Sequence, residues 1–524
     1  MKRRELTLPV VALGLLLTPS AIEAAHDVEP GRKALPEIVI RDSVPGTAHP
    51  SATVTKTATQ PANDLNLLSI PPDPRFGAAT DVTIGGRRVQ LSREQCIKIA
   101  LENSPTIRIA DLEVRRVDWS KKEVQAQLWP TIDFTGAYQR TIKLQTIRMD
   151  MGGQSQSIKM GSDNTWNFGF NASLPLVAPT LWKSIKISDT QILQNLESAR
   201  ASRLDLIDQI NKAYYSLLLA NSSYEVLRQS YETARLNASI YEKQFSVGTA
   251  TEYDVLRTQV QVSNMEPELL QAEIAIRQCK LQLKVLMGLD ETVDVDPTVT
   301  LKEMQQEMYG YQLEDRSFSL NTTLRSLELQ QEMAKQNVEL KKLAWIPTLA
   351  ATYNISWLSL SNGNPFKNQE FNPYSTVGLA VQVPIFSGGS KYYGLKGAQV
   401  QQKELELQRE TLLNNLNMQV DLALDNINKE VRQIASSAEG MRQAQKAYDI
   451  MQKSFEIGAA TYLNLRDSEN ANTAAQLTYY QAIYNYLVST SELDLLLGKE
   501  DTLNRSGIEY IKPDNYKQKI KTIE

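Results

Sequence analysis

Two long stretches of the chain place apolar residues alternately three and four positions apart. The first runs over residues 206–245 and the second over 416–455, where only Glu430 and Ser437 interrupt the pattern. A period of about 3.5 residues kept over this length is typical of a left-handed coiled coil. A helix over residues 181–247 would be roughly 100 Å long at about 1.5 Å per residue. The pattern therefore predicts long rods and not the core of a compact globular domain.

Four shorter segments alternate apolar and polar residues at every second position. We expect strands at residues 131–148, 165–176, 348–360 and 374–386, with loops rich in Gly, Ser and Asn between the members of each pair. About ten residues of alternation fits a transmembrane β-strand, although each segment alone also fits a soluble hairpin. Trp129 and Trp345 precede strands, where interfacial aromatic residues occur. An open edge in lipid leaves backbone groups unpaired, so closure of the sheet requires further chains.

Internal similarity divides the chain into two copies of one unit. Phe-Ser-Val-Gly-Thr-Ala-Thr ending at Thr251 recurs as Phe-Glu-Ile-Gly-Ala-Ala-Thr ending at Thr461. Each copy predicts a helix, two strands, a long helix, a tight turn and a shorter helix. The predicted organisation is a signal peptide (1–24), a Pro/Thr-rich leader (25–90), a first repeat with its turn at 247–250 (91–300), a second repeat with its turn at 457–460 (301–500) and a C-terminal tail (501–524).

Composition narrows the function classes. Lys2 to Arg4 and the apolar run after them predict export. Histidine occurs only at His26 and His49, so the predicted folded body lacks the usual general base and metal ligand. We therefore expect no catalytic, cofactor-binding or metal site and no enzyme activity. A formal net charge of −4 argues against a nucleic-acid partner.

Two further motifs carry a resemblance to a known family. The segment 91–105 (LSREQCIKIALENSP) and the segment 383–389 (VPIFSGG) resemble the opening helix and the strand-to-helix junction of the TolC family of outer-membrane efflux proteins. The junction residues are Pro384, Gly388 and Gly389, and Pro175 marks a weaker counterpart in the first copy. The resemblance covers about residues 91 to 500.

The resemblance implies a fold, a location and partners. The expected fold is mainly α, with coiled-coil helices forming an α-barrel and four strands per chain contributed to a trimeric β-barrel. The expected function is a homotrimeric duct of a tripartite efflux or secretion system, in the outer membrane of a Gram-negative bacterium with its helices in the periplasm. The implied partners are outer-membrane lipid, a periplasmic membrane-fusion adaptor and an inner-membrane transporter.

The resemblance also assigns roles to the two turns. Glycine there suits a left-handed helix cap, and the resemblance makes these turns the tips that dock the adaptor. The docking residues would be Val247, Gly248, Thr249, Ile457, Gly458 and Ala459. The family's acidic gate positions, six and nine residues after the second tip glycine, correspond to Asn464 and Asp467. One acid is kept and one is lost.

One alternative from another class remains open at this point. An exported coiled-coil structural or surface-layer protein would share the signal peptide, the heptads and the shortage of Cys and His. It offers no reason for four alternating strands placed symmetrically between helices.

Overall fold

The computed structural model describes residues 88–151, 154–290, 293–307, 316–367 and 369–499, and in the tail residues 503, 506, 512 and 515–517. All of them belong to one unit, Ile70–Glu524. The predicted signal peptide and most of the leader lie outside the described residues. In the described part, no helix is both long enough and apolar enough to cross a membrane.

The elements follow each other in two similar series. The first is β1 (Arg88–Leu91), α1 (Arg93–Asn103), α2 (Pro105–Ala126), β2 (Thr131–Arg140), β3 (Gln145–Met151), β4 (Gln154–Met160), β5 (Asn164–Val177), α3 (Pro179–Ser246) and α4 (Glu252–Met287). The second is β6 (Asp294–Pro297), α5 (Leu301–Glu307), α6 (Thr322–Leu343), β7 (Thr348–Ser361), β8 (Asn372–Gln382), α7 (Ser390–Glu456) and α8 (Tyr462–Leu497). Apart from the added β3–β4 hairpin, both series place a strand pair between a shorter and a much longer helix.

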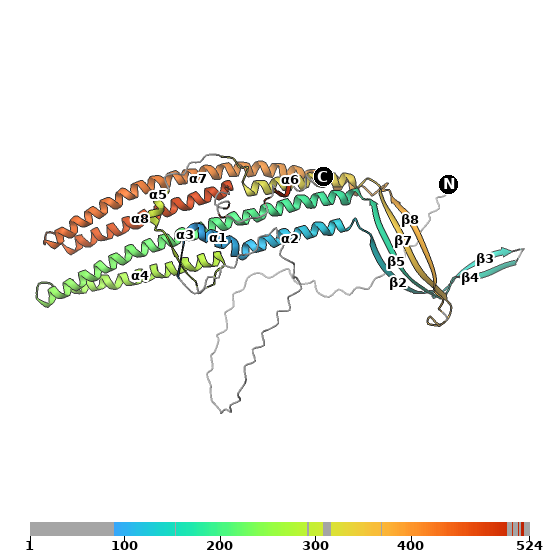
Figure 1. Ribbon diagram of the computed structural model, residues 1–524, viewed down its shortest axis with the longest axis horizontal. Coiled ribbons are helices and arrows are strands. Elements are labelled where there is room, and N and C mark those ends of the chain that lie inside the picture. Colours follow the sequence, from blue (N-terminus) through green and yellow to red (C-terminus); the bar gives the residue numbers. More distant parts are fainter. Residues whose placement is uncertain are drawn as a thin grey trace, which may run out of the picture. The chain divides into compact units, whose positions relative to one another are not determined.

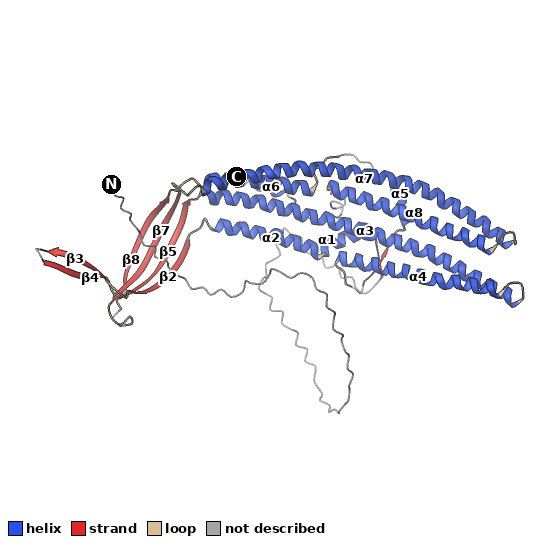
Figure 2. Cartoon of the chain, turned by 180° about the vertical axis from the view of Figure 1, so that it is seen from behind, coloured by secondary structure: helices blue, strands red, loops and turns tan. Residues whose placement is uncertain are grey.

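The main sheet has the order β2-β5-β7-β8, and every neighbouring pair is antiparallel (Figure 2). Period-two alternation gives it two unlike faces. On one face lie aromatic rings, such as the Phe134–Phe170 pair at 5.1 Å. On the other, Asn171 Nδ2 donates to Thr135 Oγ1 at 3.2 Å and Asn354 Nδ2 donates to Asn171 Oδ1, which makes a polar row across three strands. Among the described residues, the outer edges of β2 and β8 pair with no strand.

The strand bounds differ from expectation in two places. The predicted strand 131–148 ends at Arg140, and a separate hairpin, β3–β4, occupies most of the segment expected to be a loop. The residues of these two strands are mostly small or polar, as in a loop, yet they pair in register from Gln145 with Met160 to Met151 with Gln154. The predicted strand 374–386 ends at Gln382, before Pro384, which has no N–H to continue the ladder.

The helices lie side by side in a definite order. Helix α3, 68 residues long, packs on α2, α4, α6 and α8, whereas α7, 67 residues long, packs on α6 and α8 (Figure 1). The order across the layer is therefore α2 with α4, then α3, then α6 with α8, then α7. Each long helix spans roughly 100 Å and needs two shorter helices to cover it.

The shorter helices meet end to end through glycines. Gly288 and Gly498 cap α4 and α8 with φ of 65° and 68°. A Cβ at Gly288 would lie 3.0 Å from the carbonyl oxygen of Asn103, and one at Gly498 only 2.0 Å from that of Leu320. Both joints need glycine twice over, for the left-handed backbone and for the absence of a side chain.

A buried ion pair on α3 supports the second joint. Arg200 and Glu197 are both about 1% exposed and hydrogen-bond to each other. Arg200 also donates to the carbonyl oxygen of Leu320 at 2.6 Å, and more weakly to that of Gly498 at 3.5 Å. The guanidinium thus satisfies carbonyl groups at the meeting ends of α6 and α8.

Both repeats of the chain contribute to one apolar core. It includes Ile97 of α1, Ile210 and Leu217 of α3, Leu283 of α4 and Ile483 of α8, each at most 1% exposed. The polar interruptions of the second heptad pattern are buried as well. Glu430 pairs with Lys429 at 2.9 Å, and Ser437 Oγ donates to the Gln433 carbonyl at 2.7 Å, so both keep their seam positions with local partners.

Part of the C-terminal tail joins this core. Leu503 is 1% exposed, and Tyr516 packs against a second apolar cluster formed by α2 and α3. Cys96, fully buried, and Cys279, half-buried, are free thiols.

Candidate functional site

The first turn, between α3 and α4, is built around Gly248. Gly248 comes just after the end of α3 and has a φ of +79°. The amide of Thr249 donates a hydrogen bond to the Gln244 carbonyl at 2.8 Å. Thr251 and Asp254 then form a reciprocal capping box that starts α4. The Thr251 hydroxyl donates to the Asp254 carboxylate at 2.6 Å, and this hydrogen bond lowers the pKa of Asp254. Val247 lies at the exposed C-cap of α3.

The second turn, between α7 and α8, repeats this geometry. Gly458 has a φ of +76°, Ile457 is the C-cap of α7, and the Ala459 amide reaches the Ser454 carbonyl at 2.8 Å. Thr461 caps the Asn464 amide at 3.3 Å, but without a reciprocal bond from residue 464. No side chain or backbone atom lies within 4 Å of where a Cβ would be at either tip glycine, so only backbone conformation restricts these positions.

An aromatic cluster joins the two hairpins just above their tips. Tyr241 of α3 lies 5.4 Å from Tyr462 and 6.5 Å from Phe455, measured between ring centroids. The guanidinium carbon of Arg257 lies 5.5 Å from the Tyr462 ring, a cation–π arrangement. Of these four residues, Tyr241 and Phe455 belong to the two heptad patterns. Arg257 lies nine residues after Gly248, the offset that Asp467 has from Gly458, and Tyr462 is distinguished in sequence only by following the Thr461 cap.

The expected gate residues lie on α8 near the second tip. Asn464 is in the first turn of the helix and Asp467 in the second, and both side chains are exposed. Within the described part of the chain Asp467 has no ion-pair partner. One chain supplies one copy of each, so a ring of them requires other chains.

The predicted strand-to-helix junctions are not equivalent. Gly388 and Gly389 both have positive φ, and Gly389 is the N-cap of α7. Lys391, at the start of α7, donates to the Ala344 carbonyl at 2.6 Å and ties that helix to the end of α6. Pro175 sits inside β5 at a register shift against β7, so the first junction turns through a bulge and Pro179 instead.

A small polar cavity of about 50 Å³ lies between the two repeats, where no sequence pattern predicted a site. Ser230 of α3 donates to the Glu469 carboxylate of α8 at 3.2 Å, and Asn472 donates to Gln445 of α7 at 3.0 Å. Burial raises the pKa of Glu469, while the Ser230 hydrogen bond and the charge of Arg466 act in the opposite direction. In sequence Glu469 is one of several polar residues along α8, with no spacing that singles it out.

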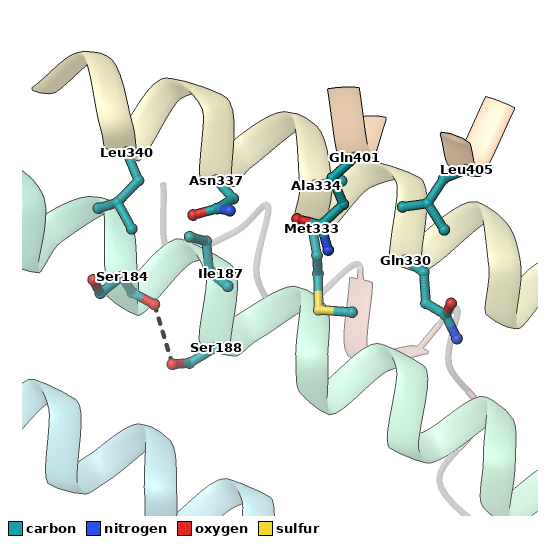
Figure 3. Close-up of a pocket in the computed structure, with 10 residues that line it drawn as sticks. All are labelled: Ser184, Ile187, Ser188, Gln330, Met333, Ala334, Asn337, Leu340, Gln401 and Leu405. Carbon is teal, nitrogen blue, oxygen red and sulfur yellow. Dashed lines mark hydrogen bonds between the residues drawn. The ribbon is translucent and has the colours of Figure 1, made fainter. Parts of the chain in front are cut away.

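A longer groove follows α6 between α3 and α7. Its volume is about 520 Å³, and Figure 3 shows that uncharged side chains line it, among them Ser188, Met333, Asn337 and Gln401. Ser188 donates to the Ser184 carbonyl at 3.1 Å. The lining offers no charged group for catalysis or for a metal, and the described residues contain no cluster of His, Cys, Asp and Glu that could hold a metal ion.

Comparison with known proteins identifies the family. The model of the family described as "Outer membrane efflux protein" matches residues 96–289 and 315–499. The chain belongs to the outer membrane efflux protein family.

Individual members are distant in sequence and close in fold. The chain is 21% identical to the outer membrane protein TolC of Vibrio cholerae over 63% of its length and 76% of TolC. It is also 21% identical to the cation efflux system protein CusC of Escherichia coli O157:H7, over 77% of this chain and 85% of CusC. The crystal structure of the CmeC outer membrane channel of Campylobacter jejuni matches with a TM-score of 0.62 at 16% identity, covering 90% of this chain and 97% of CmeC.

These findings confirm the family, the fold class and the outer-membrane efflux function expected from the sequence. They decide against the structural or surface-layer alternative. The roles of individual residues at the tips, the gate and the junctions stay predictions.

Proposed function

We propose that this chain is the homotrimeric outer-membrane channel of a tripartite efflux or secretion system. The observation that carries the proposal is that the layer of helices and strands ends, on both sides, in an unpartnered apolar edge. A single chain with two such edges is incomplete, because edge backbone groups and apolar side chains remain exposed.

The exposed large apolar side chains concentrate on the outer elements. On one side they lie on α2, α4 and β2: Ile109, Leu112, Trp119, Leu256, Val260, Leu270, Ile274, Leu281, Val285, Ile132 and Phe134. On the other side they lie on α7 and β8: Val400, Leu407, Met418, Leu422, Val431, Ile450, Val377, Leu379 and Val381. Contact between the α7–β8 edge of one copy and the α2–α4–β2 edge of the next would bury the helical residues of both sets and pair the two strand edges, whereas these strand side chains lie on the same face of the sheet as Phe170.

Strand direction supports closure by identical copies. Four strands that alternate in direction make β2 and β8 antiparallel to each other, so β8 of one copy can pair with β2 of the next. Three copies give twelve strands, enough for a central channel. The polar row of Thr135, Asn171 and Asn354 would then line the interior, and the aromatic face would contact outer-membrane lipid.

Mass measurement of the purified protein in detergent tests this assembly. We expect a trimer, and a stable monomer in well-dispersed detergent would overturn the proposal. A charged residue on the polar face, Asn171→Asp, should be tolerated far better than Phe170→Asp, which faces lipid. Comparable membrane yields of the two variants would contradict the assigned faces.

The two turns are the proposed docking tips for the periplasmic adaptor, through which the inner-membrane transporter is reached. They lie at the ends of the rods remote from the sheet, and each exposes a short apolar surface, including Val247 and Ile457. Gly458→Val should strain the left-handed backbone and impair adaptor capture while trimers still form. Gly440→Val, within α7 and with free space for a side chain, is the matched control. Normal capture by Gly458→Val trimers would exclude this assignment.

Asp467 is the proposed gate residue. Three-fold symmetry would bring three copies of its carboxylate together, and such a ring in a narrow passage attracts cations. With Asn464 uncharged, the effect should be weaker than that of two acidic rings. In single-channel recordings, Asp467→Asn should reduce cation selectivity and multivalent-cation block, whereas Asp425→Asn, exposed on α7, should not. Unchanged selectivity would leave Asp467 as an ordinary surface residue.

A further inference from the structure

Near the tips, α4 and α8 enclose a cavity of about 300 Å³ whose charges are all positive. Tyr253, Leu256, Val260, Gln261 and Asn264 of α4 line it together with Arg257 and Arg466. No carboxylate contributes to the lining. Within the described residues neither guanidinium forms a direct ion pair, although the charge of Arg257 acts on Asp254 and that of Arg466 acts on Glu469. Asp254 is hydrogen-bonded to Thr251, and Arg257 lies over the Tyr462 ring.

Half-buried guanidiniums beside an apolar floor are suited to a carboxylate that is attached to an apolar group. The floor is open, since Leu256 and Val260 are 53% and 57% exposed. These two residues belong to the α4 edge, which the proposed trimer places against α7 of the next copy.

The end of α7 carries the complementary pattern. Asp449 with Ile450, and Glu456 with Ile457, are two carboxylate–isoleucine pairs one heptad apart, and all four side chains are exposed. In the described chain neither carboxylate has an ion-pair partner. Their hydrogen bonds come from Gln445 and Gln452 on the same helix, at 2.9 and 3.3 Å.

Position along the helix axes shows which of the two carboxylates can meet Arg257. Arg257 stacks on Tyr462, and the Tyr462 ring lies 6.2 Å from that of Phe455, the residue before Glu456. Arg257 therefore lies at the height of the last turn of α7. Rotation about a three-fold axis parallel to the rods preserves height, so Glu456 of a neighbouring copy comes to the height of Arg257. Because α4 and α7 run in opposite directions, Asp449 then comes level with Asn264.

We propose that this cavity receives the end of α7 from the neighbouring copy. Glu456 pairs with Arg257, and Ile457 contacts Leu256 and Val260 with one side of its side chain, so that the other side stays on the adaptor-facing surface of the tip. The inference rests on the proposed trimer and specifies a contact that holds the tips of adjacent copies together. The cavity is completed by a residue of the second copy.

Cross-linking between differently tagged copies tests the contact. Arg257→Cys in one copy and Glu456→Cys in the other, both carrying Cys279→Ser, are co-expressed, and trimers containing both tags are isolated. A short bismaleimide should join the two tags under denaturing conditions. Asp425→Cys, exposed on α7 far above the tip, replaces Glu456→Cys in the control and should give no product.

The outcomes distinguish failure of the tip contact from failure of the trimer. Trimers that contain both tags but give no cross-link would overturn the tip contact and leave the trimer intact. Absence of any species with both tags, in a detergent where the chain is folded, would overturn the trimer itself. A link formed equally well by the Asp425→Cys control would also overturn the contact, because it would show no selection of level.

Charge reversal supplies a readout independent of cysteine chemistry. Arg257→Glu or Glu456→Arg should each speed subunit exchange between trimers about two- to fivefold, the range for a partly exposed ion pair. The combined reversal should restore exchange to near the wild-type rate. A double variant as fast as the product of the two single effects would contradict the pairing.

Discussion

The long helices α3 and α7 are the same element of a duplicated unit, yet their surroundings differ. They have nearly equal lengths and each ends at a glycine tip. Helix α3 buries residues along most of its course, including the polar pair Glu197 and Arg200, because neighbours cover it on both sides. Helix α7 buries few side chains, since its neighbours α6 and α8 both lie on one side.

The same element of the repeated unit therefore has two different roles, one in folding and one in assembly. Burial of α3 depends on the chain itself, so changes there should affect folding. Completion of α7 depends on a neighbouring copy, so changes on its outer face should affect assembly. Variants on the two helices can therefore separate folding from association.

The largest effect is expected at Arg200 of α3. Arg200→Ala leaves the Glu197 carboxylate buried without its partner and removes the donor to Leu320. We expect a loss of about 3–5 kcal/mol in the free energy of unfolding. Arg442→Ala on α7, which breaks the exposed pair with Glu439, should cost far less, because solvent screens that pair. Denaturant unfolding of both variants measures the contrast, and equal losses would refute it.

A charge on the outer face of α7 should act on assembly. Leu422 is 55% exposed on that face, so Leu422→Asp should preserve helix content and weaken each contact between copies by roughly 2 kcal/mol, the value of burying one leucine. The control is Leu236→Asp, 61% exposed on α3 but away from both outer edges. Analytical ultracentrifugation in detergent compares them. Dissociation of both variants alike would remove the distinction between edge and centre.

The caps after the two tips provide a finer comparison. Thr251→Ala removes a reciprocal capping box at the start of α4, whereas Thr461→Ala removes a single cap hydrogen bond at the start of α8. We expect losses of about 1 kcal/mol for Thr251→Ala and about 0.5 kcal/mol for Thr461→Ala. Hydrogen exchange of the first amides of α4 and α8 measures each loss locally. A larger loss for Thr461→Ala than for Thr251→Ala would contradict this ranking of the two caps.

The smallest effect concerns Glu469 of α8, whose carboxylate accepts a hydrogen bond from Ser230 of α3. Burial raises its pKa in the folded protein, so folding favours the protonated form. Stability from this group is present at pH below the unfolded value of about 4.3 and is lost as pH rises through the folded pKa. Glu469→Gln, which keeps an acceptor for Ser230, should raise the melting temperature at pH 7 but not at pH 4. Glu410→Gln, at an exposed position on α7, should leave the melting temperature unchanged at both pH values.

Much of the helical part could be predicted because its periodicity is long. Even the interruptions Glu430 and Ser437 kept the seam positions that the heptads assign them. The strands were harder. The β3–β4 hairpin consists mostly of polar and small residues, and its order comes from cross-strand pairing that no local pattern reveals. At the other end, Pro384 ended β8 earlier than the apolar alternation suggested.

At the candidate site, the sequence located the turns and not their surroundings. Gly248 and Gly458 could be found because left-handed caps favour glycine. The contact of Arg257 with Tyr462, and the burial of Glu469 beside Ser230, bring together residues about 200 or more positions apart. Such proximity depends on how α3, α4, α7 and α8 pack, which a single sequence does not specify.

The end-to-end joint at Gly498 and Leu320 has a mechanical consequence. Helices α6 and α8 act as one strut, but no continuous backbone carries load between them. Compression along the strut passes through touching helix ends, and tension depends on the hydrogen bond from Asn321 to the Leu496 carbonyl and on those that Arg200 makes. A small bend at this point leaves every dihedral angle inside both helices unchanged. Bending at this joint is therefore opposed mainly by the packing of α6 and α8 on α3 and α7, and not by the stiffness of a continuous helix.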